Sequence, residues 1–199
     1  DGKIKAALAY TSTTHLGGGH EVAIYYYDNA IKAEFKTAQV YNNLGWSLAQ
    51  RNLRTEAREF FTRAIQADPT LQVAYHNRLL LTVRQGADQG SDPQRWKATL
   101  HEGLADFDKA MQLGPVTADL YRNGARLCSL GVASDPTLAQ RGLRYVARAI
   151  EHGILPKDLR EDRLLTMGLG HLPRFWDLVD GPPSGRAHVL CRFTVDPLE

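Results

Sequence analysis

Three asparagines in this sequence stand two residues after a tyrosine, at points far apart in the chain. An amide side chain can donate and accept hydrogen bonds at once, which suits binding to the backbone of an extended peptide. Because asparagine is a mediocre helix former, helix propensity does not explain its repeated use. The candidate ligand-binding residues are therefore Asn43, Asn77 and Asn123, within the segments Tyr41-Asn42-Asn43, Tyr75-His76-Asn77 and Tyr121-Arg122-Asn123.

The residues around each asparagine give the same face a chemical character. If these segments are helical, positions one before, three after and seven after each asparagine lie on its side of the helix. One end of this row is amide and aromatic, and the other end is basic. A guanidinium there can hold a carboxylate with two hydrogen bonds. The residues are Asn42, Trp46 and Gln50; His76, Leu80 and Arg84; and Arg122, Arg126 and Leu130.

Patterns of catalysis and metal binding are missing from the sequence. Seven histidines are scattered along the chain, and His101-Glu102 is not followed by the second histidine of a zinc-binding HExxH motif. The glycines at 17–19 are not followed by the Gly-Lys-Ser/Thr of a phosphate loop. No nucleophile elbow, kinase signature or dinucleotide fingerprint is present. We therefore expect no enzymatic activity, no cofactor and no metal site.

The elements that would position the asparagines are helices. Two runs of apolar residues with helical spacing occupy 38–69 and are joined by a polar turn near Asn52, so the segment is predicted to be an αα-hairpin. Small residues stand where the two helices must approach closely, and Pro69 ends the second helix. The first run contains Tyr41, Leu44, Gly45 and Leu48, and the second contains Ala57, Phe61, Ala64 and Ile65.

The order and spacing of these residues closely resemble a tetratricopeptide (TPR) repeat. The second run recurs as Ala23, Tyr27, Ala30 and Ile31, displaced by 34 residues, which is the TPR period. The resemblance implies an all-α, right-handed superhelix of about four helical hairpins that binds other proteins. It also implies that Asn43, Asn77 and Asn123 face the concave wall, as the asparagine ladders of peptide-binding TPR proteins do. The alternative is that they are merely exposed, or that they bridge adjacent hairpins.

The other hairpins are predicted from the same pattern. The first has helices at about 4–16 and 21–36, separated by the glycines at 17–19. In the third, the second helix is displaced by 46 residues instead of 34, so about twelve residues are inserted at 85–95. The fourth should end at His152-Gly153, with glycine as the C-cap. Helix starts are predicted at Ser91-Asp92-Pro93 and at its recurrence, Ser134-Asp135-Pro136.

The repeat pattern stops after Gly153. Two short helices, 158–167 and 173–179, are predicted to cover the exposed face of the last hairpin, since a solenoid needs such a cap. Gly181 to Gly185 has the composition of a linker, and the alternating segment 188–195 is predicted to be an extended tail. We therefore expect a helical-repeat domain at 1–180 and a linker with a tail at 181–199. The cap would use Leu159, Leu164, Leu165, Phe175, Trp176 and Leu178.

Composition sets the class of protein and its partners. The net charge is +2 with both signs mixed, so neither nucleic acid nor an anionic membrane is the expected partner. Two distant cysteines, Cys128 and Cys191, fit reduced thiols and a cytoplasmic location.

The expected function is a protein-interaction scaffold whose partner is a protein or peptide, with an acidic side chain or a C-terminal carboxylate for Arg84, Arg122 and Arg126. Two alternatives stay open. The chain could be a substrate-recruiting segment of a larger enzyme, such as a bacterial signalling kinase. It could instead be an oligomerisation element whose groove is occupied by its own tail or by a sister chain.

Overall fold

The fold is a stack of antiparallel helix pairs, described by a computed structural model for residues 1–14, 19–88 and 93–181. Those residues form eleven α-helices and no strand, which confirms the all-α prediction. The predicted linker and tail lie outside the described residues, apart from Gly181. The helices are α1 (Gly2–Thr14), α2 (Gly19–Lys32), α3 (Ala38–Gln50), α4 (Arg54–Ala67), α5 (Gln72–Asp88), α6 (Pro93–Leu113), α7 (Ala118–Gly131), α8 (Leu138–Glu151), α9 (Pro156–Arg160), α10 (Arg163–Leu169) and α11 (Pro173–Asp180).

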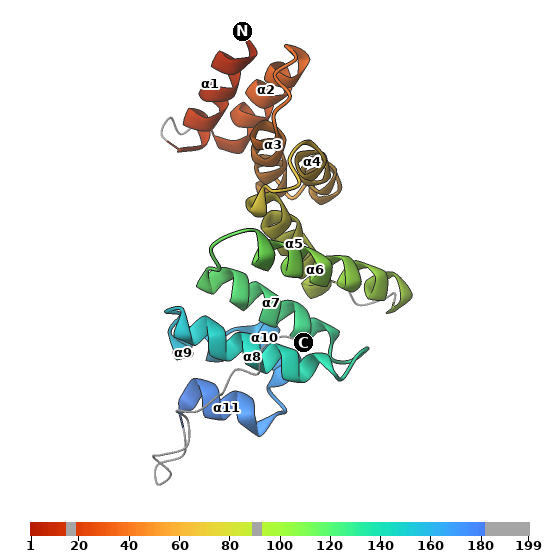
Figure 1. Cartoon of the computed structure of the whole chain (residues 1–199), viewed down its shortest axis with the longest axis vertical. Helices are drawn as coiled ribbons and strands as arrows, with labels where there is room; N and C mark the ends of the chain where they lie inside the picture. The colour runs from red at the N-terminus through yellow and green to blue at the C-terminus, as the bar shows by residue number, and fades with distance from the viewer. Residues whose placement is uncertain (15–18, 89–92, 182–199) are drawn as a thin grey trace.

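Four hairpins follow one another along the longest axis of the molecule, from α1–α2 at one end to α7–α8 near the other (Figure 1). The two helices of each hairpin pack against each other most extensively, and α2 then packs on α3, α4 on α5 and α6 on α7. The first helices of successive hairpins also touch, α3 on α5 and α5 on α7. Each hairpin therefore buries its apolar face against its neighbours, as a repeat array requires.

Small residues bring the two helices of the second hairpin together, as the sequence predicts. A Cβ atom added at Gly45 would lie 2.8 Å from the Phe61 ring. Ala57, Phe61 and Ala64 are completely buried. The close contact between α3 and α4 therefore depends on the small size of Gly45, whose added Cβ atom would also lie 3.1 Å from the Ala57 carbonyl oxygen.

The end of the second helix was predicted wrongly. α2 ends at Lys32, four residues before the predicted boundary. The amides of Glu34 and Phe35 bond to carbonyls of the last turn, and Glu34 has a φ of 62°. Thr37 then caps α3 by accepting a hydrogen bond from the Val40 amide at 3.2 Å. Phe35 packs against the same apolar cluster as α2, which is why the apolar pattern continued past the helix.

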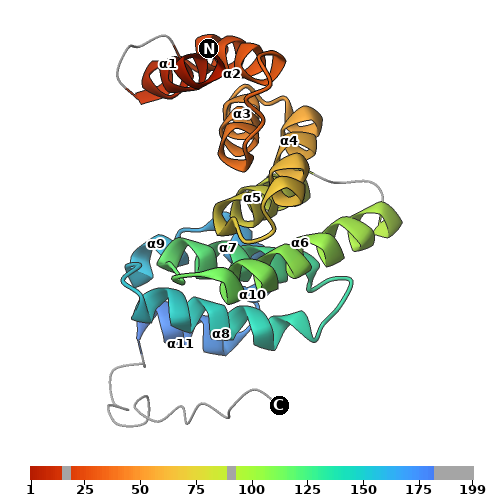
Figure 2. The same cartoon turned by 45° about the horizontal axis from the view of Figure 1, so that its top comes forward.

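The third hairpin contains the insertion. α5 continues to Asp88, into the segment 85–95 where the insertion was predicted, and α6 is the longest of the described helices, with 21 residues. Figure 2 shows α6 extending sideways beyond the stack, on the side where the connection between α7 and α8 also projects. The Trp96 ring packs on α5, because a Cβ atom at Gly86 would meet it at 2.3 Å.

Helices follow both Ser-Asp-Pro segments, although Ser91 and Asp92, the predicted start of the first, lie outside the described residues. α6 begins at Pro93, whereas α8 begins two residues after Pro136, with Thr137 as the flanking residue. The Asp135 carboxylate accepts hydrogen bonds from the Thr137 amide and hydroxyl, which makes a turn before the helix instead of a cap. At its other end α8 is followed by Gly153 with a φ of 101°, which confirms the predicted C-terminal glycine.

The C-terminal cap consists of three short helices, where the sequence predicted two. The break falls at Asp162, whose side chain accepts a hydrogen bond from the Leu164 amide and begins α10. Leu159, Leu165 and Phe175 are completely buried within the larger apolar cluster, so the predicted covering of the last hairpin is present. Trp176 stays 38% exposed and donates its indole N–H to the Gly170 carbonyl at 2.7 Å.

We expect Ala64→Leu to lower the free energy of unfolding by about 1 to 3 kcal/mol, because the larger side chain overpacks a completely buried position on α4. Ala67→Leu, on the exposed side of α4, is the matched control and should change it by less than about 0.5 kcal/mol. Urea unfolding of the two variants and the parent measures the difference. An Ala64→Leu variant as stable as the control would contradict the packing described here.

Candidate interaction surface

The candidate residues from the sequence all lie on the first helices of the second, third and fourth hairpins. Asn42, Asn43 and Trp46 are on α3, and His76, Asn77, Leu80 and Arg84 are on α5. Arg122, Asn123 and Arg126 are on α7. Since α3 packs on α5 and α5 on α7, side chains from equivalent positions are brought within reach of one another.

Two helices are joined by a short chain of amides. The Asn42 Nδ2 atom donates to the Oδ1 atom of Asn43 at 3.2 Å, and the Asn77 Nδ2 atom donates to the Oδ1 atom of Asn42 at 2.9 Å. Asn43 also bonds to the hydroxyl of Tyr27, while burial, the larger effect, raises the pKa of that phenol. These contacts connect α2, α3 and α5.

A second chain of bonds continues from α5 to the C-terminal cap. The Asn123 Nδ2 atom lies 3.1 Å from the Nε2 atom of His76, and its Oδ1 atom accepts from Arg126 at 3.1 Å. Arg126 in turn donates through Nε to the Asp162 carboxylate at 2.7 Å. We call the two chains together the polar seam, made of Asn42, Asn43, His76, Asn77, Asn123, Arg126 and Asp162.

None of the three asparagines is freely exposed, so the alternative that they are merely exposed is wrong: Asn123 is 5% exposed, and Asn43 and Asn77 are half-buried. The adjacent residue Asn42 is also 5% exposed. A buried amide is stable only when it is hydrogen-bonded, and the seam supplies those bonds. The alternative that these residues bridge adjacent hairpins therefore describes most of their bonding.

Other side chains on the same face stay accessible. Trp46 is 36% exposed, and Leu80 and Arg84 are half-buried. Trp46 lies four positions, about one helical turn, after the seam residue Asn42. Leu80 lies at the same distance after the seam residue His76, and Arg84 is one further turn along α5. The part of this face that is open to a partner is thus apolar with an adjacent guanidinium.

The arginines of α7 already have carboxylate partners. Arg122 pairs with Asp119 at 2.5 Å, and Arg126 pairs with Asp162, whose side chain is only 5% exposed. The predicted row of three arginines for a partner carboxylate is therefore reduced to Arg84. Sequence reasoning missed Asp162, because it belongs to the cap and is brought to α7 only by the packing of α10 on that helix.

Burial sets the protonation of His76. Desolvation lowers its pKa below the ordinary value of 6.5, and the charge of Asp119 opposes this shift to a smaller extent. A neutral ring can accept the hydrogen bond from the Asn123 amide at Nε2, whereas a protonated ring cannot. The hydrogen bond and the burial therefore favour the same neutral form.

Comparison with solved structures identifies the fold. The chain is similar to the crystal structure of a thermophilic TPR protein from Thermus thermophilus, with a TM-score of 0.65 and 16% sequence identity. The alignment covers 90% of this chain and 86% of that one. This chain has the fold of a TPR solenoid. No protein-family model matches the sequence, and a search of curated proteins finds no match.

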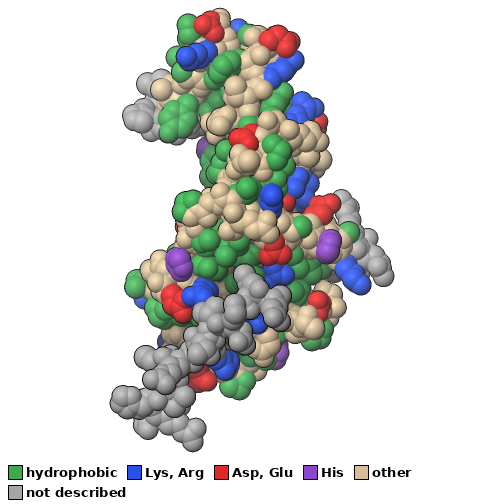
Figure 3. All heavy atoms as spheres, viewed as in Figure 1, with side chains coloured by type: hydrophobic (Ala, Val, Ile, Leu, Met, Phe, Trp, Pro, Cys, Tyr) green, Lys and Arg blue, Asp and Glu red, His purple; other side chains and the backbone are tan. Residues whose placement is uncertain are grey.

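In a TPR solenoid each repeat adds a small rotation to the stack, which gives the stack an extended concave surface. Figure 3 shows the molecule hollowed at one edge, between the first hairpin and the hairpins below it. The charges visible on this face are mixed in sign. We call the exposed face of α3, α5 and α7 the inner wall of the solenoid.

Chemistry of other kinds has little support in the described part of the chain. No group of three or more metal-binding side chains occurs there. Cys128 is buried, and desolvation raises the pKa of its thiol to about 12, so the nucleophilic thiolate is not formed near neutral pH. None of the described helices is both long and apolar enough to cross a membrane.

The bond between Asn42 and Asn77 should stabilise the fold. In a double-mutant cycle of Asn42→Ala and Asn77→Ala, we expect a coupling energy of about 0.5 to 1.5 kcal/mol, the net value of one hydrogen bond. A control cycle combines Asn42→Ala with Asn29→Ala, which removes an amide bonded within α2. The effects of these two substitutions on stability should add. Urea unfolding gives the four free energies of each cycle, and additive effects in the first cycle would rule out the seam at this point.

The stability of the chain should fall in acid partly through His76. Because the pKa of the folded state is lower than 6.5, the unfolded state binds the proton more readily. The contribution of neutral His76 to the free energy of unfolding is therefore complete above pH 6.5. It declines as the pH falls from 6.5 towards the lower pKa of the folded state. His76→Gln can still accept the Asn123 bond but does not titrate. We expect the stability of the parent relative to this variant to decrease from pH 7 to pH 5, as measured by thermal unfolding, and parallel curves would contradict it.

Proposed function

We propose that the chain is a protein-interaction scaffold that binds an extended segment of a partner protein along the inner wall. The observation that supports this most directly is the exposure of Trp46 on α3, with Leu80 and Arg84 on the same face of the adjacent helix α5, on a wall where most other polar side chains are bonded to one another. A large aromatic side chain left 36% exposed on a rigid surface is typical of a binding hot spot. Binding, and not catalysis, is the activity that this surface suits.

The asparagines have a secondary role in the proposed binding. Asn77 donates to Asn42 through Nδ2, and its Oδ1 atom makes no hydrogen bond with the described residues. Because Asn77 is half-buried, that oxygen can accept from a backbone N–H of a bound segment. Asn43 is also half-buried, whereas Asn123 acts mainly by holding α5 and α7 in register. The seam thus provides the rigid support that lowers the entropic cost of binding.

Three candidate residues contribute in different ways. His76 and Asn42 are seam residues and support the wall. Arg122 is half-buried and paired with Asp119, while its Nε atom is buried and has no hydrogen-bond partner among the described residues. We propose that this side chain reorients on binding, so that its Nε atom donates to the partner while the pair with Asp119 is kept. We also propose a cytoplasmic location, where the inert Cys128 thiol would stay reduced.

Partner capture followed by titration tests the proposed function. The 199-residue chain is used as bait, the captured proteins are identified by mass spectrometry, and binding of overlapping peptides from each is measured by calorimetry. We expect Trp46→Ala to weaken binding at least about tenfold, because hot-spot truncation costs more than about 1 to 2 kcal/mol. The matched control is Trp176→Ala, since this tryptophan is similarly exposed, at 38%, but lies on the cap.

The outcomes show whether the partner binds to the inner wall or to another surface. Folding of both variants is checked by circular dichroism and thermal unfolding. Loss of binding in Trp46→Ala but not in Trp176→Ala supports the proposal. A folded Trp46→Ala variant that binds captured peptides as tightly as the parent would show that the partner binds elsewhere.

A further inference from the structure

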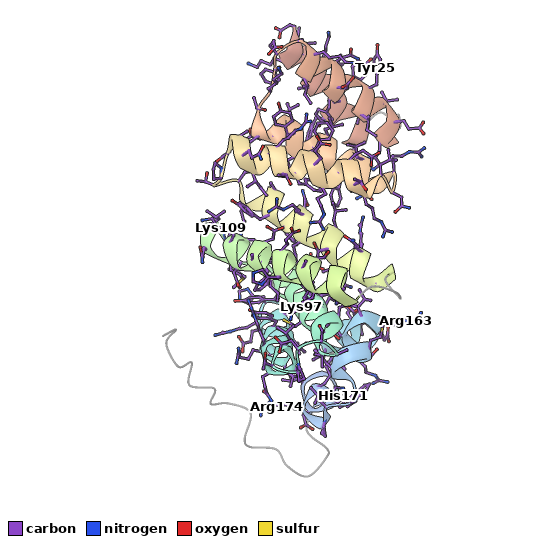
Figure 4. The ribbon with its side chains drawn as sticks, turned by 90° about the vertical axis from the view of Figure 1, so that its right-hand side faces the viewer. Tyr25, Lys97, Lys109, Arg163, His171 and Arg174 are labelled. Carbon is purple, nitrogen blue, oxygen red and sulfur yellow. The ribbon has the colours of Figure 1, made fainter. Side chains whose placement is uncertain are left out.

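Arg84 differs from the other arginines that the structure describes. It is half-buried on the inner wall and makes no hydrogen bond or ion pair with any described residue, whereas the other half-buried arginines with described side chains are all bonded. Arg144 and Arg163 also lack a described partner, but they are exposed to solvent. Figure 4 shows Arg163 at the C-terminal end of the stack, pointing away from it.

The positive charges elsewhere on the inner wall are already neutralised. Asp119 balances Arg122, and Asp162 balances Arg126. His76 is held neutral by burial and by its bond to Asn123. Within the described part of the wall, Arg84 is therefore the guanidinium left without a neutralising carboxylate, and removing a charge from water without such a partner is costly.

An apolar surface lies next to this charge. Leu80 is one turn before Arg84 on α5, so their Cβ atoms are about 5 to 6 Å apart. Trp46 occupies the equivalent turn of α3, the helix that Asn77 joins to α5 through Asn42. In an extended segment, side chains two residues apart point the same way and are about 7 Å apart. One such pair of side chains can contact Leu80 and Arg84 together.

We propose that the segment recognised by the inner wall carries an apolar side chain and, two residues away, an aspartate or glutamate. The apolar side chain packs between Trp46 and Leu80, and the carboxylate pairs with Arg84. This inference rests on the proposed function, and it adds the chemistry that distinguishes one partner from another. A guanidinium and a carboxylate can form two parallel hydrogen bonds, which fixes both position and orientation.

Selection from a phage-displayed library of random peptides, each about twelve residues long, tests the inference without a known partner. The full chain, Arg84→Gln and Trp46→Ala are each used as bait, and Arg144→Gln is the matched control because it removes an exposed arginine from α8. Asp88→Asn is added because Asp88 stands one turn after Arg84 in the sequence. The most enriched peptide and its variant with Glu→Gln or Asp→Asn are then titrated by calorimetry at two salt concentrations.

We expect the parent and Arg144→Gln to select peptides with an acidic residue two positions from an apolar one. The acidic peptide should bind the parent about tenfold more tightly than its amide variant, since hydrogen bonds between charged groups are stronger than those between neutral groups, and this preference should shrink at high salt. Arg84→Gln should keep the apolar selection and lose the acidic one.

Three results would overturn the inference. The first is an acidic preference that persists in Arg84→Gln. The second is a parent that selects apolar peptides without acidic residues, which would leave the proposed function intact. The third is an acidic preference that occurs only in Asp88→Asn, because Arg84 would then be occupied by the chain itself. If no bait selects peptides whose enrichment is lost in Trp46→Ala, the proposed function fails together with the inference.

Discussion

One buried ion pair links the two halves of the stack at its centre. Arg78 of α5 donates two hydrogen bonds to the carboxylate of Asp106 on α6, at 2.7 and 2.8 Å, and a third to the Thr62 hydroxyl on α4 at 3.0 Å. The Asp106 side chain is only 4% exposed, so either charge alone would be costly there. The buried apolar residues form two clusters, one mainly of α1–α4 and one of α5–α11. Arg78 joins the elements on both sides of that division.

The polar seam joins the first helices of successive hairpins by hydrogen bonds, in addition to their apolar packing. These bonds determine which side chains are left for a partner. Apolar packing between hairpins is non-directional, whereas the bonds of Asn42 and Asn123 fix the register of α3 on α5 and of α5 on α7. Most of the amide and guanidinium groups of this wall are used in that way. The groups left for a partner are those that the seam does not engage, which concentrates recognition on Trp46, Leu80 and Arg84.

The insertions into the compact 34-residue repeat occur from residue 85 onwards. The long α6 and the connection from α7 to α8 extend away from the stack, while Asp162 of the cap bonds back to α7. The cap therefore does more than cover an apolar face, because it neutralises Arg126 and completes the seam. Its buried leucines make it part of the same core as α7 and α8.

The sequence by itself determined the repeat, because the small residues Gly45, Ala57 and Ala64 and the period of 34 follow from contacts within a hairpin and between adjacent hairpins. It also placed the candidate side chains on one face of three helices, since that depends only on helical periodicity. Only the tertiary structure decided what those side chains do. Whether an asparagine or arginine is free depends on residues far away in the chain, such as Asp162 opposite Arg126 and His76 opposite Asn123. A local pattern cannot contain such pairings, because they arise when separate helices pack together.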